Sequence, residues 1–418
     1  MKKSISLCFF IICFGFLVKG MTCWASNYRP KVQTGIEVLQ KDNYKILHGK
    51  RVGLITNPTG VDSHMKSTID ILNEAPNVQL VALFGPEHGV RGDIHAGDVV
   101  SNRKDSKTGL PVYSLFGKTR KPTPEMLKGI DVMVYDIQDI GCRSFTYISS
   151  MGQAMEACAE NGIEFIVLDR PNPLGGERVE GNIVNDGFYS FVSQYPIPYL
   201  YGLTCGELAQ MINNEGMIKK ACQLTVVKMK GWKRKMTFMD TGLQWIISSP
   251  HIPTAESAFF YPTSGILGEL GFLSIGVGYT LPFQIFAKDS INAEDLARRM
   301  NSHQLPGVHF RPIYIKPFYS TGQGKSYQGV ETHILDYRKA PLTLIQFIVM
   351  EELYKQNPEN HVFNKGNKKR FQMFDKVCGS DYIRNKLSET MCYDSIASYW
   401  NKDVDSFKKL SKKYYLYK

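Results

Sequence analysis

The chain has 418 residues, of which 43% are hydrophobic and 21% are charged, and its formal net charge is +11 at pH 7. This composition is typical of a soluble globular protein with one large domain or two smaller ones. Nucleic acid is not expected as a partner, because no binding motif for it is present. The basic charge favours anionic partners such as cell-wall polymers, although a solvated basic surface explains it equally well.

The first 25 residues are expected to form a secretory signal peptide. Two lysines precede an apolar run over residues 5–18, and cleavage is predicted after Ala25. The run is too short to span a membrane comfortably, so stable membrane insertion is not expected. The mature protein is therefore predicted to be exported and periplasmic. Acylation of Cys23, which would anchor a lipoprotein, is an alternative interpretation.

The cysteines beyond the leader do not indicate a metal site. None of them forms a CxxC pair, so a zinc ribbon is not supported. Cys378 and Cys392 are close enough in sequence to form a disulfide in an oxidising compartment. A chain of this length needs no disulfide for its stability.

The first half of the chain predicts an open α/β sheet. Continuously apolar runs that end in Gly, Pro, Asn or Asp are typical of parallel strands buried on both faces, and they occur at 51–60, 78–89, 132–141 and 164–173. Helical stretches are predicted at 67–75, 123–128 and 143–161. This alternation predicts a Rossmann-like sheet. Neither GxGxxG nor a P-loop occurs, so no nucleotide and no other cofactor is expected.

The pattern changes in the second half. Thr204 and Glu207 predict a capped helix over 204–216. Antiparallel strands and a long helix are expected at 308–315, 329–337 and 342–358. The fold class is therefore α/β, with a Rossmann-like N-terminal domain and a smaller α+β C-terminal domain. The expected division is a signal peptide at 1–25, a catalytic domain at 26–289 and a C-terminal domain at 290–418.

Polar side chains follow all four predicted strands. Because the carboxyl ends of parallel strands meet at one edge of a sheet, a ligand site is expected there. The first two strands lead to Asn57, Glu87 and His88. The other two lead to Asp136, Gln138, Arg143, Tyr147, Asp169, Arg170 and Asn172. Arg143 and Tyr147, one helical turn apart, are expected to share a helix face that looks toward this site.

Glu87 is the leading candidate for catalysis. Carboxylates with planar polar and aromatic groups suit glycoside hydrolysis, which needs an acid to protonate the leaving oxygen. The nucleophile is then a second carboxylate or the acetamido group of the substrate. No GxSxG elbow is present for an esterase. Pairing of Glu87 with Arg91, a structural ion pair between Asp169 and Arg170, and a core role for Tyr147 are alternatives.

A metal site is a further alternative for the same loop. His88, Asp93, His95 and Asp98 lie close together in the sequence. Glu87 and His88 lack the HExxH helix spacing, and the glycines between these residues favour a loop. The prediction is therefore that no metal is bound.

Several long motifs resemble one bacterial family and occur in its order: FGPEHGVRGD, KTGLPVYSLFGKTRKPT, VYDIQDIGCRSFTYISSM, LDRPNPLGG, VEGN, GLTCGELA and YPTSG…GVGYTLPF. This is the NamZ-type exo-β-N-acetylmuramidase family, glycoside hydrolase family 171, formerly a domain of unknown function. The resemblance extends over about residues 33–418. It implies release of terminal β-1,4-linked N-acetylmuramic acid from the non-reducing ends of peptidoglycan fragments. It also implies a cleft between two domains.

The resemblance implies roles for individual residues. The family's glutamate in its Gly-Pro-Glu-His-Gly segment falls on Glu87, the implied general acid/base, with His88 orienting it. A carboxyl among apolar strand ends should have a raised pKa, which suits an acid. Arg143 or Arg170 would suit the lactyl carboxylate of muramic acid. The family's Asp-x-Gln-Asp and Thr-Tyr positions fall on Asp136, Gln138, Asp139 and Tyr147, and its Asp-Arg-Pro-Asn-Pro segment falls on Asp169, Arg170 and Asn172. The residues expected to bind substrate are Asn57, Asp136, Gln138, Arg143, Tyr147, Asp169, Arg170 and Asn172.

Two segments depart from the family's pattern. Leu200 and Tyr201 precede Gly202, where many members carry Arg or Arg-His. Residues 274–278 read SIGVG, where many members carry Ser-Glu-Gly-Arg-Gly. Acidic and basic groups are thus missing from one wall of the implied cleft, and the nearby groups expected to contact substrate are Glu256, Tyr261 and Glu269. Another wall-fragment acetamido-sugar hydrolase or amidase, and a non-catalytic muropeptide-binding protein, are the alternative functions.

Overall fold

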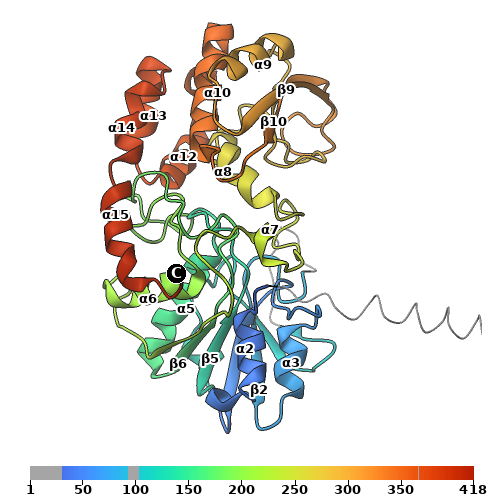
Figure 1. Ribbon diagram of the computed structural model, residues 1–418, viewed down its shortest axis with the longest axis vertical. Helices are drawn as coiled ribbons and strands as arrows, with labels where there is room; N and C mark the ends of the chain where they lie inside the picture. Colours follow the sequence, from blue (N-terminus) through green and yellow to red (C-terminus); the bar gives the residue numbers. More distant parts are fainter. Residues whose placement is uncertain (1–30, 93–102, 366) are drawn as a thin grey trace, which may run out of the picture.

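The computed structural model describes residues 31–92, 103–365 and 367–418, and it contains two domains arranged along the long axis of the molecule (Figure 1). One carries a seven-stranded sheet and the other a three-stranded sheet. The predicted fold class is confirmed. No helix in the described ranges is long and apolar enough to cross a membrane. The predicted signal peptide lies outside these ranges.

The larger sheet has the strand order β3-β4-β2-β1-β5-β6-β7, and all its strands run parallel except β3. Their bounds are β1 Arg51–Thr56, β2 Gln79–Gly85, β3 Arg103–Lys104, β4 Pro111–Ser114, β5 Val132–Asp136, β6 Glu164–Leu168 and β7 Leu224–Val227. The four predicted strands are confirmed as β1, β2, β5 and β6. Strands β3, β4 and β7 were not predicted from the sequence, because they are short and β4 and β7 are only partly buried.

Helices cover both faces of this sheet, which explains why its central strands are apolar on both sides. One face packs against α2 (Gly35–Lys41) and α3 (Thr68–Glu74). The other face packs against α4 (Pro124–Leu127), α5 (Tyr147–Asn161) and α6 (Cys205–Asn214). The predicted capping box at the start of α6 is present.

Helix α5 begins at Tyr147, later than the predicted start at Arg143. The backbone N–H of Arg143 donates to the carbonyl of Tyr199 at 2.8 Å. Cys142 forms an isolated antiparallel β-bridge with Leu200. Residues 142–143 therefore pair with the segment at 199–200 instead of extending the helix. The prediction that Arg143 and Tyr147 share one helix face was wrong for this reason.

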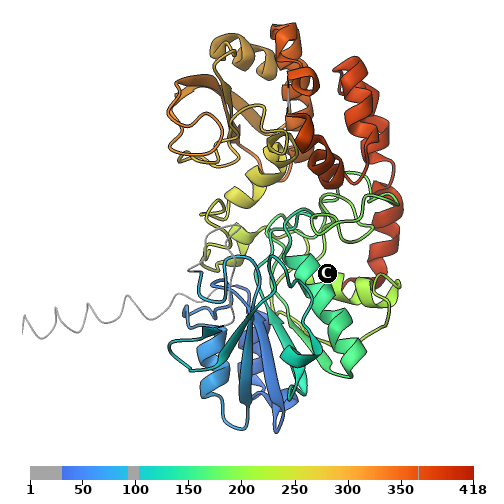
Figure 2. The same ribbon diagram turned by 180° about the vertical axis from the view of Figure 1, so that it is seen from behind.

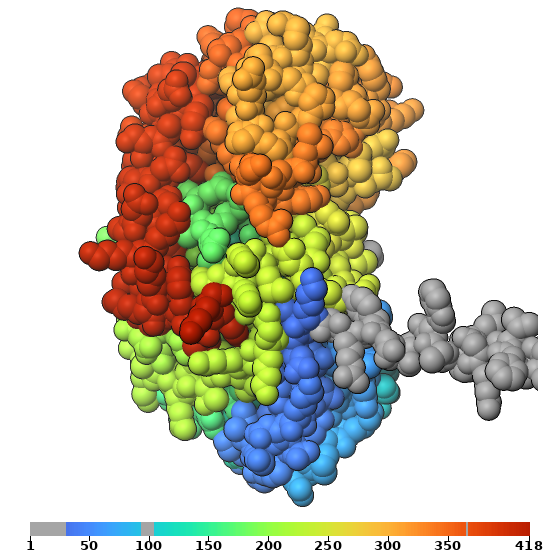
Figure 3. All heavy atoms as spheres, in the orientation of Figure 1, coloured from blue at the N-terminus to red at the C-terminus, as the bar shows by residue number. Residues whose placement is uncertain are grey.

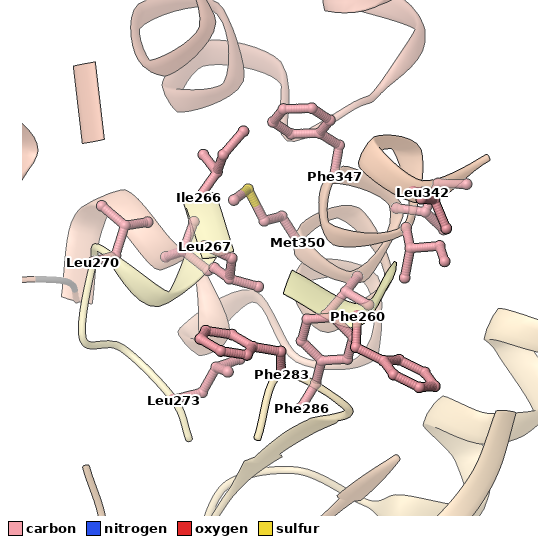
Figure 4. Close-up of a cluster of buried hydrophobic side chains, with 14 of the residues drawn as sticks. Phe260, Ile266, Leu267, Leu270, Leu273, Phe283, Phe286, Leu342, Phe347 and Met350 are labelled. Carbon is pink, nitrogen blue, oxygen red and sulfur yellow. The ribbon is translucent and has the colours of Figure 1, made fainter. Parts of the chain in front are cut away.

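The second domain is built on an antiparallel sheet with the order β8-β10-β9. Its elements are α8 Ser257–Gly268, β8 Ile285–Lys288, α9 Ala293–Ser302, β9 Val308–Ile315, β10 Tyr327–Ile334 and α10 Leu342–Gln356. Side chains of α8 and α10 meet in its core (Figure 4). The strands and long helix predicted here are confirmed. The division of the chain at 289/290 stays a prediction.

The C-terminal helices return the chain to the first domain (Figures 1 and 2). The short helix α7 spans Phe238–Thr241, and the C-terminal series is α11 Val362–Lys365, α12 Phe371–Cys378, α13 Tyr382–Thr390, α14 Asp394–Asn401 and α15 Val404–Ser411. Phe407 and Tyr414 pack into the core beside α6. The hydroxyl of Tyr417 donates to Asp169 at 2.6 Å. The chain end thus ties the second domain to the sheet.

The cysteines in the described residues are free, including Cys378 and Cys392. Cys378 is buried at the end of α12, whereas Cys392 lies beyond α13 and is partly exposed. The disulfide considered from their spacing therefore does not form in this structure.

Candidate active site

The loop after β2 places Glu87 and His88 in a tight turn. The N–H of Gly89 donates to the carbonyl of Pro86 at 3.0 Å, and His88 has a φ of 75°. A positive φ at the third position of such a turn favours glycine, so a histidine there costs conformational free energy. Strained backbone of this kind is concentrated at functional sites. The turn therefore presents two adjacent ionisable side chains where the sheet ends.

These two side chains line a cavity of about 340 Å³ between the two domains. Tyr147 and residues 144–146 come from the loop and helix that follow β5, and Tyr261, Glu269 and Phe283 come from the second domain. Val192, Ser249, His251 and Ile252 complete the wall. Glu87, His88, Tyr147, Tyr261 and Glu269 are thus the predicted site residues that the structure brings together.

Glu87 has the electrostatics of a proton donor. Burial raises its pKa above the ordinary 4.5, while the charges of His88 and Arg120 lower it. Burial is the largest of these effects, because removing water disfavours the ionised carboxylate. Arg120 is exposed and stacks over the Phe191 ring at 4.4 Å. The expectation of a raised pKa for Glu87 agrees with this environment.

His251 was missed by the sequence analysis, although it lies in the same cavity. Its Nε2 is 2.8 Å from the hydroxyl of Tyr319, a residue of the loop that follows β9. Burial, together with the charge of His88, lowers the pKa of His251. The segment that carries it, SSPH, has no periodic pattern or motif that would single out a histidine. Only the fold brings His251 to the cavity.

Aromatic rings form one side of the cavity. Phe145 contacts Tyr147 and Tyr261 edge-on, with ring centroids 4.8 and 5.8 Å apart, and Tyr261 contacts Phe283 at 4.9 Å. The hydroxyl of Tyr261 is 3.1 Å from Oγ of Ser144. Rings with polar edges suit a sugar, which has apolar C–H faces and polar hydroxyls.

The polar residues at the ends of β5 and β6 form buried ion pairs and hydrogen bonds with one another and do not line the cavity. Asp136 is fully buried and binds Arg170 through two contacts, Nε–Oδ1 at 2.5 Å and Nη2–Oδ2 at 2.9 Å. Its Oδ2 also accepts from Thr68 at 2.5 Å, and Arg170 donates to the carbonyl of Val61. These groups are satisfied by one another and lie outside the cavity of Glu87.

Arg143 is also placed away from this cavity. Its side chain is fully buried and donates to the backbone carbonyls of Asn182, Ile197 and Val377 at 2.6–2.9 Å. Val377 belongs to α12, so this guanidinium joins the two domains. Neither Arg143 nor Arg170 is positioned to bind a substrate carboxylate, because each is held by internal acceptors.

Other predicted residues have structural partners as well. Gln138 donates to the carbonyls of Asp139 and Pro171, and Asn172 donates to the carbonyl of Leu203. Asp169 accepts from the backbone N–H groups of Arg170 and Gly206. It also accepts from the hydroxyls of Thr204 and Tyr417. Asn57 accepts from Thr59 and lies beside the hydroxyl of Tyr147, behind the cavity wall. Glu256 precedes α8 and does not line the cavity.

Asp139 is a buried carboxyl with incomplete hydrogen bonding. Its Oδ2 accepts from the hydroxyl of Tyr201 at 2.5 Å and from the N–H of Gly141 at 2.7 Å. Its Oδ1 has no hydrogen-bond partner among the described residues. Burial raises the pKa of Asp139 to about 7. Tyr201 thus hydrogen-bonds a buried carboxyl that is not among the residues lining the cavity of Glu87.

The metal alternative finds no support among the described residues, where no group of three or more His, Cys, Asp or Glu side chains is arranged to hold an ion. Asp93, His95 and Asp98, on which that alternative depended, lie outside these residues. Arg91 pairs with Asp105 at 2.8 Å and not with Glu87, which leaves the carboxyl of Glu87 to the cavity.

A second hollow of about 410 Å³ lies on the face shown in Figure 3, where green residues are visible between the red C-terminal helices and the orange and yellow-green segments. Its basic side chains are largely engaged. Arg178 binds Glu180 and Arg234 binds Glu207, each at 2.6 Å. Arg178 also donates to the carbonyls of Tyr337 and Ala340 in the second domain. These groups are used for structure, so the cavity of Glu87 is the candidate active site.

Comparison with known proteins identifies the family. Family models described as the N-terminal and C-terminal parts of exo-β-N-acetylmuramidase NamZ match residues 52–256 and 259–417. The chain is 47% identical over 389 residues to the peptidoglycan β-N-acetylmuramidase NamZ of Bacillus subtilis (strain 168), covering 93% of this chain and 92% of that protein.

Two crystal structures of DUF1343 family proteins from Bacteroides fragilis NCTC 9343 share the fold. One has a TM-score of 0.91 and 66% identity, and it covers 93% of this chain and 100% of that chain. The other has a TM-score of 0.72 and 29% identity, with 93% and 99% covered. The resemblance stated from the motifs is confirmed: the chain belongs to the exo-β-N-acetylmuramidase NamZ family and is a glycosidase.

Proposed function

We propose that this glycosidase removes terminal β-1,4-linked N-acetylmuramic acid from the non-reducing ends of peptidoglycan fragments, with Glu87 as general acid and base. The observation that carries the proposal is the burial of Glu87, next to His88, in the wall of a cavity to which both domains contribute. The name of the Bacillus subtilis relative supports peptidoglycan as the substrate.

The proposed first step is proton transfer from Glu87 to the glycosidic oxygen as the bond from that oxygen to the anomeric carbon breaks. The ionised Glu87 then accepts a proton from the water that attacks the anomeric carbon. A pKa raised by burial suits both tasks, because the carboxyl keeps its proton until the leaving oxygen needs it. His88 orients this carboxyl from the neighbouring position of the turn.

The second group of the mechanism is either Glu269 or the acetamido oxygen of the substrate. Glu269 lines the same cavity, and burial raises its pKa while Arg370 lowers it. A raised pKa widens the pH range in which Glu269 is protonated, and a protonated carboxyl is a poor nucleophile, so this environment favours the acetamido route. If Glu269→Gln retained most of the wild-type kcat, that route would be supported, whereas a loss as large as that of Glu87→Gln would assign Glu269 as the nucleophile.

The test uses a chromogenic β-N-acetylmuramide and the matching β-N-acetylglucosaminide. We expect release from the muramide, and we expect Glu87→Gln to lower kcat by about 100-fold to 10,000-fold while the protein remains folded. Wild-type kcat in Glu87→Gln would show that Glu87 is not the acid. Preference for the glucosaminide would indicate a different acetamido-sugar hydrolase, and release from neither would favour a muropeptide-binding protein.

We also propose that the chain is exported, on the basis of the signal-like composition of residues 1–25. The N-terminus of the protein isolated from the periplasm should then begin at Ser26. An intact Met1 would contradict export by this route, and a lipid-modified Cys23 would establish the lipoprotein alternative.

A further inference from the structure

A side pocket of about 240 Å³ in the second domain adjoins the cavity of Glu87. The two spaces share Tyr261, Glu269 and Phe283, so they lie next to each other. Tyr261 lies within electrostatic range of both Glu87 and Glu269. The side pocket is therefore within reach of a substituent on a sugar bound at Glu87.

Arg370 supplies the positive charge of this pocket. It is exposed, lines the pocket and makes no ion pair with a carboxylate of the described residues, although its charge acts on Glu269. A Cβ on Gly271 would lie 2.5 Å from Nη1 of Arg370. Gly271, which also has a φ of 59°, thus leaves the space in which the guanidinium lies. Such a fork is suited to a carboxylate.

The remaining wall suits a small apolar group next to that charge. Ile275 and Val277 line the pocket, and Ser320 and Thr321 add hydroxyls from the loop after β9. This loop is attached to the 274–278 segment, because the N–H of Phe318 donates to the carbonyl of Gly278 at 2.8 Å. The pocket thus combines a guanidinium, hydroxyl donors and an aliphatic surface.

We propose that this side pocket binds the lactyl carboxylate of N-acetylmuramic acid, with Arg370 as the residue that recognises the charge. The inference rests on the proposed function for its sugar. A lactyl ether carries a methyl group and a carboxylate on one carbon, which matches the aliphatic wall and the guanidinium. Glu269 faces the same space as a carboxyl whose pKa is raised by burial. In its protonated form it donates a hydrogen bond and does not repel the ligand.

The charge and the aliphatic surface of the pocket come from separate segments of the second domain. Ile275 and Val277 belong to the 274–278 segment, whereas Arg370 directly precedes α12.

The experiment measures binding of N-acetylmuramic acid, its neutral methyl ester and N-acetylglucosamine by calorimetry, in the inactive Glu87→Gln background. Arg370→Gln should weaken binding of the acid by about 10-fold to 100-fold, as expected for a hydrogen-bonded charge. Its affinity for the ester and for N-acetylglucosamine should change by less than about twofold, since neither carries the charge. Arg370→Lys should restore part of the lost affinity. Lys369→Gln, the same charge change one residue away and outside the pocket, is the matched control.

Kinetics with the muramide keep this inference separate from the proposed function. In an otherwise wild-type chain, Arg370→Gln should raise KM with little change in kcat, because it removes binding shared by ground and transition states. Equal affinities of Arg370→Gln and Lys369→Gln for the acid, or equal loss for acid and ester, would overturn the inference even if the muramide is hydrolysed. Arg370-dependent binding without any hydrolysis would support it while refuting the proposed function.

Discussion

Acidic residues at the ends of two strands of one sheet, β2 and β5 on either side of β1, are used differently. Glu87, after β2, faces a cavity shared by both domains, and the largest influence on its pKa is burial. Asp136, at the end of β5, forms a bidentate ion pair with Arg170. Both look alike in the sequence, as acids that follow an apolar strand. The difference teaches that position at a strand end brings a residue to the site edge, whereas its partners decide whether it is available.

The largest expected effect is on stability at the β5 end. Arg170→Met should cost about 3–5 kcal/mol in the free energy of unfolding, because it leaves Asp136 buried without its cation. Glu87→Gln should cost less than about 1 kcal/mol, since no structural partner depends on its charge. Urea unfolding followed by circular dichroism measures both. Similar losses for the two variants would contradict the contrast between the strand ends.

A double variant sharpens the same point. Asp136→Asn combined with Arg170→Met removes both charges, so it should recover part of the stability lost in Arg170→Met alone. A double variant less stable than either single one would mean that the hydrogen bonds of Asp136, and not its charge, dominate.

The next largest loss in the free energy of unfolding is expected on replacing Arg143. Arg143→Met removes the donors of three buried carbonyls, and each carbonyl left without a donor costs about 1 kcal/mol or more, so a loss of about 3 kcal/mol is expected. The muramide kcat of the remaining folded protein should stay close to that of the wild type, in contrast to Glu87→Gln. A large loss of kcat without loss of stability would instead show that Arg143 acts in the active site.

Asp139 should give the protein a pH-dependent stability. Its pKa is about 7 in the folded state against an ordinary 3.8, so the folded state binds an extra proton between these values. Stability from this group is complete below about pH 4 and is lost as pH rises toward 7. Relative to Asp139→Asn, the wild type should lose on the order of 1 kcal/mol per pH unit in this window. A difference that does not change with pH would show that Asp139 titrates normally.

The smallest expected effect concerns Arg120. The muramidase rate should fall as pH rises through the pKa of Glu87, because the acid must be protonated. Arg120 lowers that pKa, so Arg120→Gln should move the alkaline limb of the kcat/KM profile to higher pH. Lys118→Gln, a nearby exposed lysine that does not act on Glu87, is the control. An identical shift in both variants would indicate a general effect of surface charge.

The sequence by itself determined the fold class and the position of Glu87. Continuous apolar runs are the signature of strands buried on both faces, and glycine and proline mark where they end. The Gly-Pro-Glu-His-Gly turn needs only local geometry to place its acid directly after β2. These features can be predicted without tertiary information because each one is encoded within about ten neighbouring residues.

Only the tertiary structure decided which polar residues are free to act. Arg143 and Arg170 are held by acceptors far away in the sequence, and Asp136 is held by Arg170. His251 lines the cavity of Glu87 and Arg370 lines the side pocket, and each comes from a segment without a motif. Burial makes an unpartnered charge costly, so the fold pairs most buried charges internally. Which of them remain open depends on contacts between distant segments, and no local pattern records those contacts.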